Sequence, residues 1–282
     1  MTYKQLLDEA KQQIRKASLE EDVAKLLLMH YTQERLANIY ANLDKIADEK
    51  VIKSFNNGIK KYVNKQIPLG YITGVETFFG YEFIVNKNVL IPRRETEELV
   101  ERLIYYITDN YDNNINLLDI GAGSGCIGIT LDKELKNVNV TATDISRKAI
   151  KVAKLNNEKL LANVSFVRGD LFEPVANKKF DVIVSNPPYI VKEGYIGKTV
   201  KHEPKISLYG GIDGLDFYRK IIFGAKAHLK NNGLIAFEHA FDTAEQIKEI
   251  ALNAFANAKV TCYKDLSGYD RITFIEIGEI NG

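Results

Sequence analysis

The sequence is poor in the residues that build disulfide frameworks, metal centres and membrane spans. Its 282 residues include no tryptophan, two cysteines, two methionines and four histidines. Cys126 and Cys262 are not in CxxC spacing, so the sequence predicts neither a disulfide framework nor a zinc site. No apolar run approaches the roughly 18 residues of a membrane-spanning helix, and the first residues lack a signal-peptide core. We therefore expect a cytoplasmic protein with no bound metal and no membrane contact.

An excess of either charge is also missing. The formal net charge is only +1, from 38 Lys and Arg against 37 Asp and Glu. A protein that binds nucleic acid through its overall charge usually carries a larger positive excess, so we expect no direct contact with nucleic acid. A hydrophobic content of 45% and a charged content of 27% are typical of globular proteins. Nothing in the composition indicates an obligate oligomer, and we expect a monomer.

Residues 1–66 show helical patterns alone. The tetrapeptide Ser18-Leu19-Glu20-Glu21 predicts a capping box at the start of a helix. That helix would turn one apolar face toward a core, with its histidine packed there rather than binding a metal. The residues of this face are Val23, Leu26, Leu27, His30 and Tyr31. Because no catalytic constellation occurs here, we expect a small all-helical domain that recognises a partner.

Residues 67–95 interrupt the helical pattern. The stretch PLGYITG (68–74) contains one proline and two glycines, which break helices. Two apolar runs follow at 77–85 and 89–91, separated by the turn-like Asn86-Lys87-Asn88, and this pattern predicts a β-hairpin. We expect a linker here, followed by a second domain over 96–282.

From Asn116 onward, strand and helix patterns alternate, which is typical of a parallel sheet covered on both faces. Near the end of the chain, 259–263 and 271–277 predict an antiparallel hairpin. The expected fold class is α/β, a Rossmann-like sheet with a C-terminal antiparallel hairpin. Ligands of open α/β sheets bind at the carboxyl ends of the strands. The residues expected to line that crevice are Gly121, Ala122, Gly123, Ser124, Gly125, Asp144, Asp170 and Asn186.

A proline-rich pentapeptide, Ser185-Asn186-Pro187-Pro188-Tyr189, follows the apolar strand 180–184. Neither proline can donate a ladder hydrogen bond, so the strand ends there. The Asn186 amide oxygen and the Pro187 carbonyl are then two acceptors on a stiff backbone, and Tyr189 adds a flat ring. This arrangement predicts a slot for a planar NH₂ group. The plainer alternative is a strand-end turn with an asparagine cap and an exposed tyrosine.

The glycine loop allows two cofactors. Gly123-Ser124-Gly125-Cys126-Ile127-Gly128 matches GxGxxG, so a nicotinamide-dependent dehydrogenase is a rival interpretation. Asp144 stands about 20 residues past the glycines, where an acid can bind the ribose of any adenosine-containing cofactor. The predicted hairpin, the amide slot and the lack of an obvious acid–base residue in that slot favour S-adenosylmethionine. The histidines His202 and His239 leave the dehydrogenase interpretation open.

The remaining motifs resemble one family of methyltransferases. Asn-Pro-Pro-Tyr after a strand resembles the motif of class I enzymes that methylate planar amino or amide nitrogens, including those of adenine and cytosine. More specific stretches, from about residue 68 to the C-terminus, are similar to the PrmC/HemK family, and the helical residues 1–66 match it in kind and position. These stretches are PLGYITG (68–74), VLIPRRETE (89–97), HEP (202–204), GGIDGL (210–215) and FEH (237–239).

The resemblance implies a defined reaction. Enzymes of this family transfer a methyl group from S-adenosyl-L-methionine to the side-chain amide nitrogen (N5) of the glutamine in the Gly-Gly-Gln loop of class I peptide chain release factors. It implies that Asn186, Pro187 and Tyr189 are catalytic and that, with Pro188, they bind the substrate amide.

The resemblance also assigns cofactor contacts. The loop 121–125 would lie near the methionine end, Asp144 at the ribose, and Asp170 with Leu171 beside the adenine, while Asn186 also borders the cofactor. Some family members carry tryptophan in place of Leu171, so aliphatic packing is expected here instead of stacking. Two other functions are a nucleic-acid adenine methyltransferase and a non-catalytic binding module. The near-neutral charge counts against the first, and the intact glycine loop counts against the second.

Overall fold

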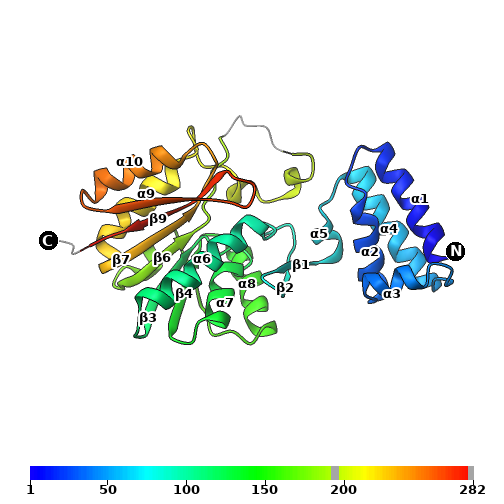
Figure 1. The fold of residues 1–282 in the computed structure, drawn as a ribbon, viewed down its shortest axis with the longest axis horizontal. Coiled ribbons are helices and arrows are strands. Elements are labelled where there is room, and N and C mark those ends of the chain that lie inside the picture. The colour runs from blue at the N-terminus through cyan, green and yellow to red at the C-terminus, as the bar shows by residue number, and fades with distance from the viewer. Residues whose placement is uncertain (192–196, 279–282) are drawn as a thin grey trace. The chain divides into compact units, whose positions relative to one another are not determined.

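The computed structural model describes residues 1–191 and 197–278. These residues form two compact units, one made of 1–75 with 197–202 and the other of 76–191 with 203–278. In Figure 1 residues 1–75 are blue to cyan, and the second unit contains the large sheet. No helix in the described ranges is long and apolar enough to cross a membrane. The same ranges contain no group of His, Cys, Asp and Glu side chains that could hold a metal ion.

The first unit is helical and has its own core. Apolar side chains recur at helical spacing in three of its helices, and Leu6, Leu27 and Phe55 are fully or almost fully buried in one cluster. His202 belongs to this unit, where its Nε2 donates to the Lys65 carbonyl oxygen at 2.7 Å. Its helices are α1 (Tyr3–Lys16), α2 (Asp22–Thr32), α3 (Leu36–Ala41), α4 (Glu49–Lys65), α5 (Leu69–Thr73) and the 3₁₀ turn η2 (Val200–His202).

The capping box predicted at residues 18–21 is wrong. Ser18 has a φ of 54°, and its N–H bonds to the Arg15 carbonyl at 3.0 Å, so it ends α1 instead of opening α2. Glu21 precedes α2 without a side-chain cap and pairs with Arg15 at 2.7 Å. Thr2 and Gln5 form a capping box at the start of α1.

The apolar face predicted for α2 is partly wrong. Val23 and Leu27 are buried, but Leu26 is 40% exposed and Leu28 is fully buried. The buried face of α2 is rotated relative to the predicted one, because the helix packs against both α1 and α4. His30 is only half-buried on this helix.

The second unit contains a seven-stranded sheet in the order β5-β4-β3-β6-β7-β9-β8. The strands from β5 to β7 are parallel, and β9 is antiparallel to both of its neighbours. The predicted α/β class and C-terminal hairpin are confirmed. Because β9 lies between β7 and β8, the reversed strand is one position in from the edge (Figure 1). The strands are β3 (Ile115–Ile120), β4 (Val138–Asp144), β5 (Ser165–Arg168), β6 (Phe180–Ser185), β7 (Leu229–Glu238), β8 (Lys259–Lys264) and β9 (Asp270–Glu276).

Helices cover both faces of this sheet. Alternate residues along β3 separate into two buried clusters: Leu117 packs with α6, α7 and α8, whereas Leu118 packs with α9 and α10. This division gives the sheet two apolar layers, as a central parallel sheet requires. The helices are α6 (Arg94–Asn110), α7 (Cys126–Glu134), α8 (Arg147–Lys159), α9 (Asp216–His228) and α10 (Ala244–Ala254), with the 3₁₀ turns η1 (Glu173–Val175) and η3 (Lys205–Ser207).

The predicted linker hairpin exists but is shifted. Its strands are β1 (Val75–Phe78) and β2 (Tyr81–Ile84), joined by Phe79 and Gly80. Both turn residues have positive φ, 51° and 78°, as in the two-residue turns that match the twist of a hairpin. The run 89–91 forms no strand, because the Ile91 N–H bonds to the Glu203 carboxylate instead of a neighbouring strand.

Candidate active site

A glycine-rich loop joins β3 to α7. Gly121, Gly123 and Gly125 have φ values of 82°, 55° and 84°, which other residues rarely adopt. A Cβ on Gly125 would lie 2.9 Å from side-chain atoms of Ile129 and Phe166, so packing requires a glycine there. A Cβ on Gly121 would meet no atom within 4 Å. The loop therefore faces open space at Gly121, where a ligand can approach its backbone.

Asp144, at the end of β4, ties this loop to the neighbouring strand. Its Oδ2 accepts a hydrogen bond from the Gly123 N–H at 2.9 Å, and its Oδ1 accepts one from the Ser146 N–H at 2.7 Å. Burial raises the pKa of Asp144 above its ordinary value, while the two N–H donors act in the opposite direction. Each oxygen keeps a further lone pair, so the ionised carboxylate can also accept hydrogen bonds from ligand hydroxyl groups.

Asp119 is a residue of this site that sequence reasoning missed. It is buried near the end of β3, where its Oδ2 accepts from the Gly128 N–H at 3.1 Å. Its Oδ1 has no hydrogen-bond partner within the described residues. Burial, assisted by the nearby charge of Asp144, raises the pKa of Asp119 to about 7. In the sequence it is marked only as an acid inside an apolar strand, two residues before Gly121, which is a weak signal.

Asn186 follows β6 and is held by side chains from distant parts of the chain. Its Nδ2 donates to Thr96 Oγ1 at 3.1 Å, and the Thr96 hydroxyl donates to Glu238 Oε2 at 2.5 Å. Thr96 lies in the first turn of α6, and Glu238 is the last residue of β7. With the NH₂ group directed at Thr96, the amide oxygen is left for a ligand. Neither Thr96 nor Glu238 was predicted as a site residue, although each lies in a stretch that carries the family resemblance, 89–97 and 237–239.

The backbone of the proline-rich stretch is fixed by a second loop. The Ile190 N–H donates to the Leu208 carbonyl at 2.8 Å, and the Gly210 N–H donates to the Ile190 carbonyl at 2.9 Å. A Cβ on Gly210 would lie 2.5 Å from the Pro188 carbonyl oxygen and 2.8 Å from the Tyr189 Cα. This close approach admits only glycine, so the GGIDGL stretch supports the predicted slot directly.

A pocket of about 250 Å³ lies at the carboxyl edge of the parallel strands. Most of the site residues predicted from the sequence line it, which brings the glycine loop and the proline-rich stretch together. Its lining also includes residues that sequence reasoning did not find, among them Phe217 and the cation Lys220. The predicted residues in the lining are Gly121, Gly123, Asp144, Asp170, Leu171, Asn186, Pro187 and Pro188.

The other predicted residues lie outside that lining. Ala122 and Ser124 are buried within the loop, and Gly125 is the N-cap of α7. Tyr189 is half-buried and packs against the apolar cluster beneath α9. Burial raises the pKa of Tyr189 to about 12, so its hydroxyl stays neutral.

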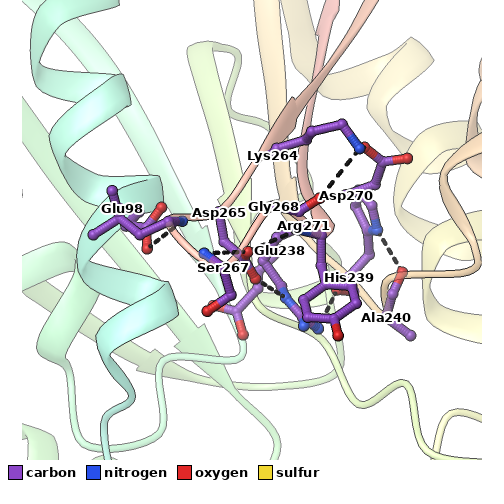
Figure 2. Close-up of polar contacts among 12 residues, drawn as sticks. Glu98, Glu238, His239, Ala240, Lys264, Asp265, Ser267, Gly268, Asp270 and Arg271 are labelled. Carbon is purple, nitrogen blue, oxygen red and sulfur yellow. Dashed lines mark hydrogen bonds and ion pairs between the residues drawn. The ribbon is translucent and has the colours of Figure 1, made fainter.

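His202 and His239, which left the dehydrogenase interpretation open, do not line this pocket. His239 is fully buried, with Nδ1 bonded to the Ala240 carbonyl and Nε2 bonded to Thr273 Oγ1, both at 2.8 Å. Figure 2 shows His239 beside Glu238 and Arg271 at the end of the sheet. His202 belongs to the helical unit. Neither imidazole lines the pocket where hydride chemistry would take place.

Two further contacts hold the site together. Arg93, directly before α6, pairs with the buried carboxylate of Glu203, whose other oxygen accepts from the Ile91 N–H at 3.2 Å. Burial raises the pKa of Glu203, and the charge of Arg93 opposes this effect. Asn156 of α8 donates to the carbonyls of Ile84 and Ser124 at 3.0 and 2.9 Å, and thereby links β2 to the glycine loop.

Comparison with known proteins gives consistent matches along the chain. Residues 5–74 match the family model described as PrmC N-terminal domain, and residues 98–203 match the methyltransferase small domain. The release factor glutamine methyltransferase of Bacillus cereus is 39% identical over 264 residues, covering 92% of this chain and 93% of that protein. That of Bacillus subtilis is 40% identical over 262 residues, covering 90% and 91%.

A solved structure supports the fold. It is the 16S rRNA N2 G1207 methyltransferase of T. thermophilus in complex with AdoMet and guanosine, with a TM-score of 0.53 and 16% sequence identity. The match covers 72% of this chain and 49% of that one.

Proposed function

Because this chain belongs to the release factor glutamine methyltransferase family, we propose that it methylates the side-chain amide nitrogen (N5) of a release-factor glutamine. The glutamine is that of the Gly-Gly-Gln motif of class I peptide chain release factors. The methyl donor is S-adenosyl-L-methionine, and the modification supports translation termination.

The pocket at the carboxyl edge of the sheet supports this choice of cofactor. The space beside Gly121, where a side chain would stand, is open, so the cofactor can approach the backbone there. The carboxylate oxygens of Asp144 can accept hydrogen bonds from the ribose hydroxyls. Leu171 gives an apolar contact for the adenine ring beside Asp170. When bound, the cofactor supplies a methyl group on a positively charged sulfur. The residues of the chain bind it and orient it.

The slot after β6 suits a carboxamide. An amide nitrogen is a poor nucleophile because its lone pair is delocalised into the carbonyl group. Asn186 Oδ1 and the Pro187 carbonyl would each accept one N–H of the substrate amide, which aligns the nitrogen and favours positive charge as it is methylated. Tyr189 follows these acceptors outside the pocket lining, and its ring would lie against the amide plane where the glutamine side chain enters. One N–H proton then leaves to solvent, so no side chain has to deprotonate the substrate beforehand.

One observation carries the proposal: Asn186 lines the same pocket as the glycine loop and Asp144, and its NH₂ group is already bonded to Thr96. The test is mass spectrometry of a purified class I release factor incubated with the enzyme and S-adenosylmethionine. We expect one added methyl group on the glutamine of the Gly-Gly-Gln motif. An adenine-containing DNA oligonucleotide serves as the competing substrate. Methylation of the oligonucleotide and not of the factor would contradict the proposal.

We assign recognition of the release factor to the helical residues 1–66, with 67–95 as the linker to the catalytic residues 96–282. Residues 1–75 carry twelve Lys and Arg against nine Asp and Glu, and the pocket draws no lining residue from them. Removal of residues 1–66 should weaken methylation of the intact factor far more than methylation of a short Gly-Gly-Gln peptide. Equal activity of the truncated and full-length enzymes on the intact factor would contradict this role. Calorimetric binding of the cofactor checks that the catalytic unit is folded.

A further inference from the structure

We propose that Thr96 and Glu238 are positioning residues for the methyl transfer. In this inference, the Glu238 carboxylate orients the Thr96 hydroxyl, and Thr96 fixes the Asn186 amide with its oxygen toward the substrate. The inference rests on the proposed function, because it assigns the substrate amide to Asn186. It concerns two residues that do not line the pocket themselves.

The three groups form one continuous chain of hydrogen bonds. Asn186 Nδ2 lies 3.1 Å from Thr96 Oγ1, which lies 2.5 Å from Glu238 Oε2. Thr96 is 3% exposed and Glu238 is 2% exposed, so water does not replace either contact easily. The chain joins residues 90 and 142 positions apart in the sequence: one in α6, one at the end of β7 and one in the loop after β6. Such a network is costly to bury unless its members are all bonded, and here they bond one another.

The direction of each hydrogen bond follows from the charge at one end. An ionised carboxylate can only accept, so the Thr96 hydroxyl must donate its single proton to Glu238. The Thr96 oxygen is then left with lone pairs alone and can only accept from Asn186. Asn186 must therefore turn its NH₂ group inward and its carbonyl oxygen outward. A substrate NH₂ group needs that outward acceptor, whereas a reversed amide would present a donor to a donor.

Protonation of Glu238 removes this constraint. A carboxylic acid can donate to Thr96 Oγ1, after which the hydroxyl can either donate to the Asn186 amide oxygen or accept from its NH₂ group. Burial raises the pKa of Glu238 to about 7, with Glu95 acting in the same direction and the hydrogen bond from Thr96 and the charge of Arg271 opposing it. The rate of methyl transfer should therefore rise with pH through about 7. The charged and titratable groups facing Glu238 are Glu95, Cys126, Tyr189, Tyr218 and Arg271.

Arg271, whose charge acts on Glu238, is itself held in place by hydrogen bonds. Its Nε bonds to Asp265 Oδ2 and its Nη1 donates to the His239 carbonyl, both at 3.2 Å. Figure 2 shows these contacts beside the turn that joins β8 to β9. The reversed strand β9 thus brings a cation to the end of β7, where it favours the ionised form of Glu238.

The test compares single-turnover methylation of a release factor by three variants with saturating cofactor. Thr96→Val keeps the shape but removes the hydroxyl, and we expect a rate roughly 10–100-fold lower with little change in KM. Thr96→Ser restores the hydroxyl and should return the rate to within about threefold of wild type. Glu238→Gln can donate to Thr96, so its rate should fall about 10-fold and lose the rise near pH 7.

Matched controls separate orientation from folding. Thr108→Val lies on the same helix at an exposed position, and Glu101→Gln is likewise exposed on α6, so both should match wild type. Cofactor affinity by calorimetry and the midpoint of thermal unfolding are recorded for every variant. A positioning role predicts that the rate changes while cofactor affinity does not.

Several outcomes would overturn the inference. A Thr96→Val enzyme within about threefold of wild type would show that the hydroxyl does not orient Asn186. Retention of the pH dependence by Glu238→Gln would assign it to another group. The wild-type profile needs no variant, and a flat rate from about pH 5.5 to 8.5 would equally reject the role of Glu238. Absence of glutamine methylation by wild type would instead contradict the proposed function, and with it this inference.

Discussion

The two halves of the site are held by different kinds of contact. In the cofactor half, backbone N–H groups bond to carboxylates near in sequence: Asp144 binds Gly123 and Ser146, and Asp119 binds Gly128. In the amide half, side chains far apart in sequence bond one another, and a separate loop packs on the backbone. The contacts of the cofactor half are therefore local in the sequence, whereas those of the amide half join distant segments.

This difference has a physical consequence. Backbone donors of a glycine loop are fixed as soon as the strand, turn and helix have formed. The orientation of an amide side chain is fixed only when every partner is in place, because rotation by 180° exchanges its oxygen and its NH₂ group. The amide half should therefore be more sensitive to single substitutions than the cofactor half.

The largest effect should come from Asn186→Ala, which removes one acceptor for the substrate amide. We expect kcat to fall roughly 10²–10³-fold, as when one preorganised partner of a transition state is lost. Cofactor affinity should change much less, because the glycine loop and Asp144 remain. Single-turnover methylation with saturating cofactor measures the first quantity, and calorimetry measures the second. Asn139→Ala, at an exposed position of β4, is the matched control. A rate within about threefold of wild type would mean that the amide binds elsewhere.

Gly210→Ala should come next, although Gly210 touches no reacting atom. The added methyl group would stand 2.5 Å from the Pro188 carbonyl oxygen, so the proline-rich stretch must shift. A misplacement of about 1 Å can lower the rate by up to roughly 10²-fold. Gly278→Ala, where a Cβ would meet nothing within 4 Å, controls for loss of a glycine. Unchanged kcat with Gly210→Ala would show that this loop does not support the slot.

Asp144→Asn tests the cofactor half. One oxygen becomes an NH₂ group that faces either the Gly123 or the Ser146 N–H, and a charged acceptor for the ribose is lost. Loss of a hydrogen bond to a charged group costs about 1.5–3 kcal/mol, so the Kd for S-adenosylmethionine should rise roughly 10–100-fold. Calorimetry with S-adenosylmethionine and with NAD decides between the two cofactors. Binding of NAD alone by wild type would revive the dehydrogenase.

Asp119→Asn should have the smallest effect on activity, because asparagine keeps an acceptor for the Gly128 N–H. Its effect should appear in stability. The pKa of Asp119 is raised from 3.8 to about 7, so the folded state holds a proton that the unfolded state releases. Wild type therefore loses about 2–4 kcal/mol of stability from this group as the pH rises from about 4 to 8. The asparagine variant should lack this loss. Urea unfolding at pH 5 and pH 8 measures it, and an equal pH dependence in both proteins would contradict the assignment.

The sequence by itself determined the cofactor half and the class of fold. A buried strand, a glycine turn and a helix follow one another, with an acid at the end of the next strand, and this order is enough to bring Gly121 and Asp144 to one edge. The C-terminal hairpin was also predictable, because a short turn between two strands makes them antiparallel. The sequence missed Asp119, since one acid in an apolar strand has no distinctive spacing.

Only the tertiary structure decided how Asn186 is oriented and what supports it. Thr96 opens a helix, Glu238 ends a strand and Gly210 lies in a loop, and no local pattern connects them. The linker hairpin and the start of α2 were misplaced for a related reason. Asn86 and Ser18 are residues typical of turns, but the structure that follows each turn depends on distant partners. For example, the Ile91 N–H bonds to the Glu203 carboxylate and not to a neighbouring strand. Side-chain contacts between distant segments form only on folding, so short-range sequence patterns do not encode them.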